Sequence, residues 1–202
     1  MNTEITVHPK LHHFGLATAN LEPMIDWYRK VLGMTINHRE ALPAGARNAP
    51  FSGFAFVSND EMDHRVVFFE MPGVAIDPDK RRHTGLQHVA FECATLDELL
   101  GTYVRLKGLG ILPVWAADHG VGTSLYYDDP DQNVIEINLN NYGNNWTATE
   151  FMRSSPPIMP AQVDPDKMIA ARKAGASPWE LHERALAGEF TPAKRFDPQT
   201  RL

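Results

Sequence analysis

The sequence contains an internal repeat, in which residues of the first half recur 75 positions later. Five residues match in type at this single offset: Leu11 and Leu86, His13 and His88, Leu21 and Leu96, Tyr28 and Tyr103, and Gly33 and Gly108. Such a repeat predicts that one supersecondary unit is used twice, because a single copy cannot bury its own apolar face. The two copies are therefore expected to pack against each other or around a ligand.

Each copy is expected to begin with a strand followed by a helix. Residues 11–18 and 86–93 have strand composition, and each is followed by apolar residues at helical spacing. In the first copy Asn20 is expected to cap the helix and Gly33 to end it. In the second copy Thr95 and Glu98 have the spacing of a capping box.

Three further strands are predicted after each helix. They are residues 35–39, 51–58 and 65–70 in the first copy, and 111–115, 122–127 and 134–139 in the second. Each copy is thus βαβββ, and the predicted fold class is α+β. Two βαβββ modules, residues 8–75 and 84–142, are expected to form an open, cupped β-sheet barrel within one domain, residues 1–145.

Residues 146–202 form a predicted C-terminal extension with a helical tail. It is Pro-rich at first, and Asp164-Pro165 and then Ser177 with Glu180 indicate the starts of two short helices. Helices this short are unstable alone in water. We therefore expect the extension to pack on the core or on a partner subunit, and we expect a homo-oligomer.

Charge and composition exclude several classes of partner. The formal net charge is -6, and no run of Lys and Arg is present, which argues against nucleic acid and anionic membranes. The opening residues 1–6 lack a targeting pattern, and no segment approaches about 18 uninterrupted apolar residues. The single cysteine, Cys93, cannot form an internal disulfide. These features predict a cytoplasmic protein.

His13, His88 and Glu136 are the predicted metal ligands. The repeat puts the two His residues at equivalent places, and strand alternation points Glu136 away from the apolar face of residues 134–139. A carboxylate in such a strand is costly to bury without a charge or a metal. A lone strand His is more often a hydrogen-bonded core residue, but two neutral His and one carboxylate are the ligand set of non-haem Fe(II) oxygen chemistry. His12 aligns with Gln87 and is expected on the opposite face from His13.

These three residues, with the turn Asp129-Pro130-Asp131, resemble the vicinal oxygen chelate superfamily over residues 8–142. Within it, His64, His119 and Tyr126 resemble catalytic residues of the one-domain type I extradiol ring-cleaving dioxygenases. The resemblance implies an Fe(II) cofactor, O2, and a catecholic substrate of catechol or biphenyl-2,3-diol type; the ligand set suits Mn(II) as well. It implies that His64 serves the oxygen side and that His119 and Tyr126 hold the substrate hydroxyls. Two departures are Gln132, where the turn usually has Gly, and a shorter spacing from His119 to Tyr126 than in larger members.

Two other functions remain as alternatives. A glyoxalase-like isomerase or thiol transferase would follow if Glu70 were a second carboxylate ligand, although Val67, and not Glu70, is expected opposite Glu136. A metal-free small-molecule-binding protein would have no use for the metal ligands. His64 has the alternative of a charged surface turn residue, and Tyr127 is expected to pack. The remaining His residues are interpreted as surface or linker residues: His8, His38, His83 and His182.

Overall fold

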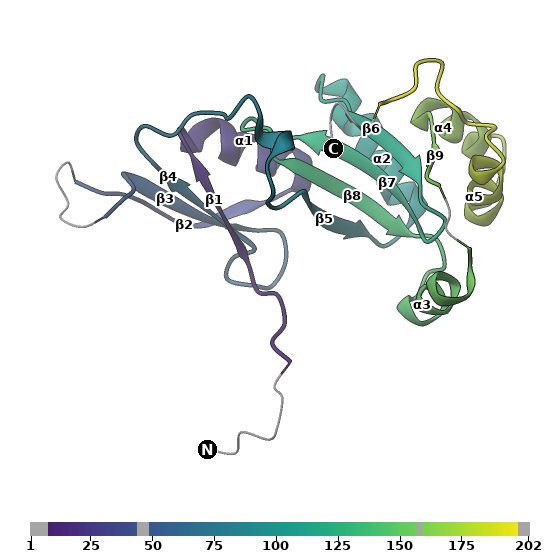
Figure 1. Ribbon diagram of the computed structural model, residues 1–202, viewed down its shortest axis with the longest axis horizontal. Helices are drawn as coiled ribbons and strands as arrows, with labels where there is room; N and C mark the ends of the chain where they lie inside the picture. The colour runs from purple at the N-terminus through teal and green to yellow at the C-terminus, as the bar shows by residue number, and fades with distance from the viewer. Residues whose placement is uncertain (1–7, 44–48, 157–158, 198–202) are drawn as a thin grey trace. The chain divides into compact units, whose positions relative to one another are not determined.

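A computed structural model describes residues 8–43, 49–156 and 159–197 (Figure 1). The opening residues 1–6, for which no targeting pattern is expected, lie outside the described residues. The chain divides into two compact units, one ending at Asp77 and the other beginning at Pro78. Among the described helices, none is long and apolar enough to cross a membrane.

The first unit is a four-stranded sheet with one helix. Its elements are β1 (Phe14–Thr18), α1 (Leu21–Leu32), β2 (Thr35–Ala41), β3 (Gly53–Ser58) and β4 (Val66–Glu70), and the strand order is β1-β4-β3-β2. As predicted, the Asn20 side chain accepts a hydrogen bond from Glu22 N, and Gly33 ends the helix at a φ of 68°. Residues at helical spacing on α1 are buried, so this face of the helix packs on β3 and β4.

The core of the first unit lies between α1 and its sheet. Met24, Tyr28 and Phe68 are completely buried, and the rings of Tyr28 and Phe68 meet edge to face with centroids 4.9 Å apart. Burying side chains of this size stabilises a fold by about 1.5–3 kcal/mol each. The opposite face of the sheet is left for other contacts, and it carries Gly15 and Val67.

The second unit repeats the first with the same strand order. Its repeated elements are β5 (His88–Cys93), α2 (Leu96–Gly108), β6 (Trp115–Asp118), β7 (Gly122–Asp128) and β8 (Val134–Asn140), preceded by the short helix η1 (Lys80–Arg82). Four strands follow the order β5-β8-β7-β6, and Thr95 with Glu98 forms the predicted capping box. The α+β class with two βαβββ modules and open sheets is thus confirmed.

The parallel strand pairs share one register. Gly15 pairs with Val67 on β1 and β4, and Ala90, which is 75 positions after Gly15, pairs with Glu136 on β5 and β8. Val67 therefore occupies in the first unit the place that Glu136 occupies in the second.

One predicted strand is wrong. Residues 111–115 were expected as a strand, but the strand begins at Trp115 and runs to Asp118. Pro113 has no N–H to donate to a sheet ladder, so pairing starts only when Val114 N donates to Tyr126 O at 2.7 Å.

The turn before β8 is held by a buried carboxylate. Asp129 Oδ1 accepts from Asp131 N at 2.9 Å and from Asn133 N at 2.8 Å, while Oδ2 accepts from Asn133 Nδ2 at 2.7 Å. Gln132, in this turn, has a φ of 61°, the left-handed region that favours Gly. The Asp129 hydrogen bonds hold the strained turn, which fixes the start of the strand that carries Glu136.

The C-terminal segment adds α3 (Asn145–Ser154), β9 (Ala161–Gln162), α4 (Pro165–Lys173) and α5 (Pro178–Leu186). Figure 1 shows β9 beside β6 with α4 and α5 beyond it, and β9 pairs antiparallel with β6. On α4, Asp166 accepts from Tyr103 Oη at 3.1 Å and from Lys107 Nζ at 2.6 Å, both on α2. The predicted Ser177–Glu180 capping box and the Asp164 cap are present, whereas α3 and β9 were not predicted.

Candidate functional site

An open pocket of about 750 Å³ lies on the second unit. Its walls are β5, β7 and β8, on the sheet face that carries Glu136, together with α3. Four of the six predicted site residues line it: His88, His119, Tyr126 and Glu136. The other two, His13 and His64, belong to the first unit.

Glu136 and His88 meet at the floor of this pocket. Glu136 is 7% exposed, and its Oε2 lies 2.9 Å from His88 Nε2. Its Oε1 accepts a hydrogen bond from Ser124 Oγ at 2.5 Å. A carboxylate this buried is costly without cationic or hydrogen-bonding partners. Carboxylate and imidazole are donors that Fe(II) and Mn(II) both accept, so the pair fits part of a divalent metal site.

The residue before each predicted His ligand contacts that ligand's Nδ1. Gln87 Oε1 accepts from Nδ1 of His88, which leaves the lone pair of that ring on Nε2, facing Glu136. In the first unit, Nδ1 of His12 lies 2.8 Å from Nδ1 of His13. His12 was expected on the opposite face from His13, and this is wrong: β1 begins only at Phe14, so strand alternation does not extend to His12.

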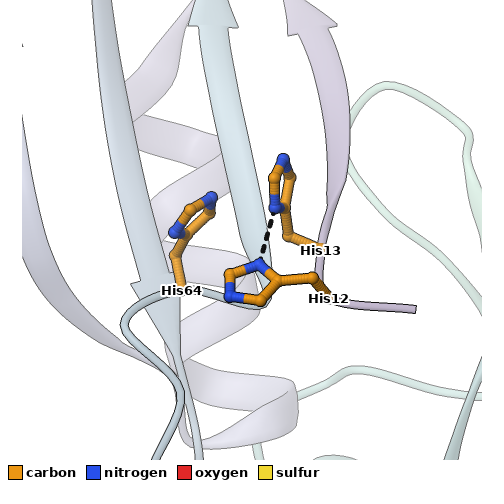
Figure 2. A group of neighbouring side chains, drawn as sticks. All are labelled: His12, His13 and His64. Atoms are coloured by element: carbon orange, nitrogen blue, oxygen red, sulfur yellow. Dashed lines mark hydrogen bonds between the residues drawn. The ribbon is translucent and has the colours of Figure 1, made fainter. Parts of the chain in front are cut away.

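His64 joins His12 and His13 in a three-imidazole cluster (Figure 2). Ligand atoms of the three rings lie within 4.8 Å of one another, so they could hold a metal ion. Asp63 binds two of the rings: Oδ2 lies 2.8 Å from His64 Nδ1, and Oδ1 lies 3.0 Å from His12 Nε2.

The His64 ring is buried rather than exposed as a surface turn residue would be. It is 9% exposed and stacks on Phe56 with ring centroids 4.5 Å apart. The hydrogen bond from His64 lowers the pKa of the Asp63 carboxyl. Because Asp63 occupies Nδ1, the second ring nitrogen of His64, Nε2, is the one available for proton transfer.

His119 and Tyr126 form the polar wall of the pocket. Tyr126 Oη lies 3.0 Å from His119 Nε2, and Trp115 stacks on the Tyr126 ring with centroids 4.8 Å apart. Burial lowers the pKa of the His119 imidazole and raises the pKa of the Tyr126 hydroxyl well above its ordinary value. Near neutral pH the pair is therefore a neutral base beside a protonated hydroxyl.

Glu70 lies at the other end of its strand from the His13 cluster. Its Oε1 accepts from Leu21 N at 3.3 Å, at the start of α1, and its Oε2 accepts from Ser52 Oγ at 2.9 Å. In the β1–β4 register Glu70 pairs with Thr18, four residues beyond Phe14, which is about 13 Å along a strand. Glu70 is therefore not a ligand to a metal held by His13.

Several residues near the site were not predicted from the sequence. Ser124 holds Glu136 from the neighbouring strand, and α3 contributes Ala148 and Met152 to the pocket wall. Ser124 sits two residues from Tyr126, so strand alternation could have placed it on the pocket face. His182 was expected at the surface, and this is wrong, because it is buried against Asp118. His8, His38 and His83 are exposed, and Tyr127 packs in the core.

Comparisons with known proteins agree with this architecture. Residues 10–137 match the family described as Glyoxalase/Bleomycin resistance protein/Dioxygenase superfamily. The chain is 36% identical to biphenyl-2,3-diol 1,2-dioxygenase 3 of Rhodococcus globerulus, over 91% of this chain and 92% of that protein. It is 33% identical to biphenyl-2,3-diol 1,2-dioxygenase 2 of the same organism, over 93% and 94%.

A solved structure shares the fold. A glyoxylase/bleomycin resistance protein/dioxygenase domain from Frankia sp. EAN1pec superposes with a TM-score of 0.57, covering 68% of this chain and 96% of that chain at 21% identity. At this identity the likeness concerns the fold alone.

Proposed function

This chain belongs to the Glyoxalase/Bleomycin resistance protein/Dioxygenase superfamily, and we propose that it is an Fe(II)-dependent extradiol dioxygenase that opens a catecholic ring with O2. One observation carries the proposal. A predicted ligand pair, His88 and Glu136, shares one pocket with a neutral base and a hydroxyl, His119 and Tyr126. The two Rhodococcus globerulus relatives, named as biphenyl-2,3-diol dioxygenases, support it.

His13, His88 and Glu136 would hold the metal. Bound there, Fe(II) would supply the one-electron chemistry that lets O2 react with an aromatic diol. The contacts to Nδ1 of each His leave Nε2 for the metal. The same donors suit Mn(II).

The proton work falls to the other three residues. His119 accepts a proton from a substrate hydroxyl, because burial keeps its imidazole neutral. The Tyr126 hydroxyl, which burial keeps protonated, donates a hydrogen bond to a substrate oxygen. His64, held at Nδ1 by Asp63, supplies a proton on the oxygen side through Nε2. His119 and Tyr126 therefore act on the diol, and His64 acts on the oxygen.

The pocket suits an aromatic substrate of catechol or biphenyl-2,3-diol type. Its volume, about 750 Å³, lies in the range of small-molecule sites. The polar groups lie on the sheet, while Ala148 and Met152 of α3 offer apolar contacts to a ring substituent. A glyoxalase-like isomerase would need a second carboxylate, but Val67 stands at the repeat position of Glu136.

The test is anaerobic reconstitution with Fe(II), followed by a panel of catechols and then O2. We expect one O2 consumed per catechol and a coloured, ring-opened product, with no turnover in protein loaded with Zn(II). Isomerisation of a glutathione hemithioacetal without O2, in protein loaded with Ni(II) or Zn(II) and unresponsive to every catechol, would instead establish the isomerase.

The pH profile of kcat/KM should reflect the lowered pKa of the His119 imidazole. Burial lowers the pKa of His119 below its ordinary 6.5, and only the neutral ring accepts a proton. Activity is therefore expected to persist below pH 6.5 and to fall as the pH drops through the lowered pKa. In His119→Gln this acid limb should disappear along with most of the activity. An unchanged limb in that variant would assign the titration to another group.

A further inference from the structure

A buried contact between an imidazole and a carboxylate links the C-terminal segment to the pocket wall. His182 on α5 lies with its Nδ1 2.8 Å from Oδ2 of Asp118, the last residue of β6. The two side chains are 5% and 0% exposed. A buried carboxylate needs its partners, so each contact to Asp118 matters for the local structure.

Asp118 also binds the turn that carries His119. Its Oδ1 accepts from Gly120 N at 2.7 Å, and its Oδ2 accepts from Thr123 Oγ1 at 3.1 Å. His119 N donates to Gly122 O at 2.8 Å, and Gly120 has a φ of 81°, which closes the turn tightly. His119, between these anchored residues, directs Nε2 at Tyr126 Oη.

The helix that presents His182 is itself firmly placed. Its capping box and Pro178 fix its first turn, and Leu181 and Ala185 are completely buried. A further contact reaches the opposite wall of the pocket: Tyr142 packs on Trp179 of α5 and on Phe151 of α3. The helix α5 therefore touches both the His119 turn and the segment that holds α3.

We propose that His182 is a positioning residue, through which the C-terminal segment fixes Asp118 and thereby the aim of His119 at the substrate. This inference rests on the proposed function for the role of His119. The match to the superfamily ends at residue 137, so the partner of Asp118 comes from outside the matched part of the chain. The pocket of this protein is thus completed by its own C-terminal segment.

Loss of His182 should loosen the turn without unfolding the unit. Asp118 would still accept from Gly120 N, from Thr123 Oγ1 and from Asn141 Nδ2, the last at 3.2 Å. The ligand pair His88–Glu136 is untouched. Metal content should therefore stay constant while His119 loses its fixed orientation.

The experiment compares His182→Leu, which removes the donor, with His182→Gln, which restores a neutral donor of similar reach. Met168→Ala is the matched control, because Met168 is likewise buried in the C-terminal segment, on α4, which packs on α2 and α5. Amide hydrogen exchange at Gly120 and anaerobic catechol affinity are the two readouts, with circular dichroism and iron content as checks. In His182→Leu we expect about tenfold faster exchange and about tenfold weaker catechol binding, the order expected for losing one hydrogen bond to a charged group. His182→Gln should recover most of both.

The inference is overturned if His182→Leu matches the wild type in both readouts, or if Met168→Ala reproduces both changes. If His182→Leu does not fold, His182→Asn, with a donor of shorter reach, is measured in its place and should change both readouts in the same direction. The exchange measurement needs no substrate. If the protein binds no catechol at all, the proposed function is wrong. The rate of amide exchange at Gly120 still tests whether His182 holds the turn.

Discussion

Glu136→Gln is expected to yield folded protein that retains about a tenth or less of the iron bound by the wild type. The neutral amide removes the only anionic donor from the proposed site of two His and one carboxylate, and metal binding depends on deprotonated ligands. The fold should persist, because the amide can still accept from Ser124 Oγ while the cost of a buried charge disappears. Iron per chain after purification, together with a thermal melt, measures both effects.

Glu70→Gln is the matched control for this change. It makes the same substitution at a half-buried carboxylate. The Glu70 carboxylate accepts hydrogen bonds from Leu21 N and Ser52 Oγ and does not contact the His13 cluster. This variant should keep its iron. Full iron and normal activity in Glu136→Gln would remove Glu136 from the metal site, and a parallel loss in Glu70→Gln would favour the isomerase-type ligand set.

His64→Ala and Tyr126→Phe should each keep iron and lose turnover by about 10²- to 10⁴-fold, the usual cost of removing one general acid or base. Neither residue is proposed as a metal ligand. His64 is held by Asp63 with one nitrogen left for proton transfer, and Tyr126 meets His119 at the substrate wall. Steady-state kcat with a catechol, measured at equal iron content, gives the result.

The chain offers a matched control for each. His38→Ala removes an exposed His on β2, and Tyr127→Phe removes a buried hydroxyl that has no hydrogen-bond partner among the described residues. Both controls should turn over at close to the wild-type rate. Equal losses in variant and control would mean that general damage, not proton transfer, explains the effect.

The features that were predicted correctly are mostly those that depend on residues close together in the sequence. Helix ends are examples, because a cap depends only on neighbouring residues and can be predicted without knowing the fold. They include the caps at Asn20 and Thr95, the helix end at Gly33 and the Ser177–Glu180 capping box. The repeat offset then ordered the strands, and the shared register of β1–β4 and β5–β8 follows from it. Glu136 was selected by strand alternation, and its Oε2 lies 2.9 Å from Nε2 of His88, 48 positions away in sequence.

Most of the predictions that were wrong concern residues whose structure depends on partners distant in the sequence. The strand Trp115–Asp118 has weak strand propensity, and it exists because β7 and β9 pair with it on either side. His182 has no local sign of burial, since its partner Asp118 is 64 residues away. His12 was misplaced because strand alternation was extended past the first paired residue, Phe14.

The two-residue strand β9 also has a consequence for solubility. An outermost strand with unpaired N–H and C=O groups is a template for pairing with another chain, and proteins protect such edges against aggregation. The first unit does so within β2, which has a bulge between Ile36 and His38 and carries the charges of Arg39 and Glu40. The strand β6, Trp115-Ala-Ala-Asp, has little charge of its own, and β9 covers it instead. A fragment limited to the matched residues 10–137 would expose the unpaired edge of β6. We expect such a fragment to aggregate more readily than the full chain, so the C-terminal segment also contributes to solubility.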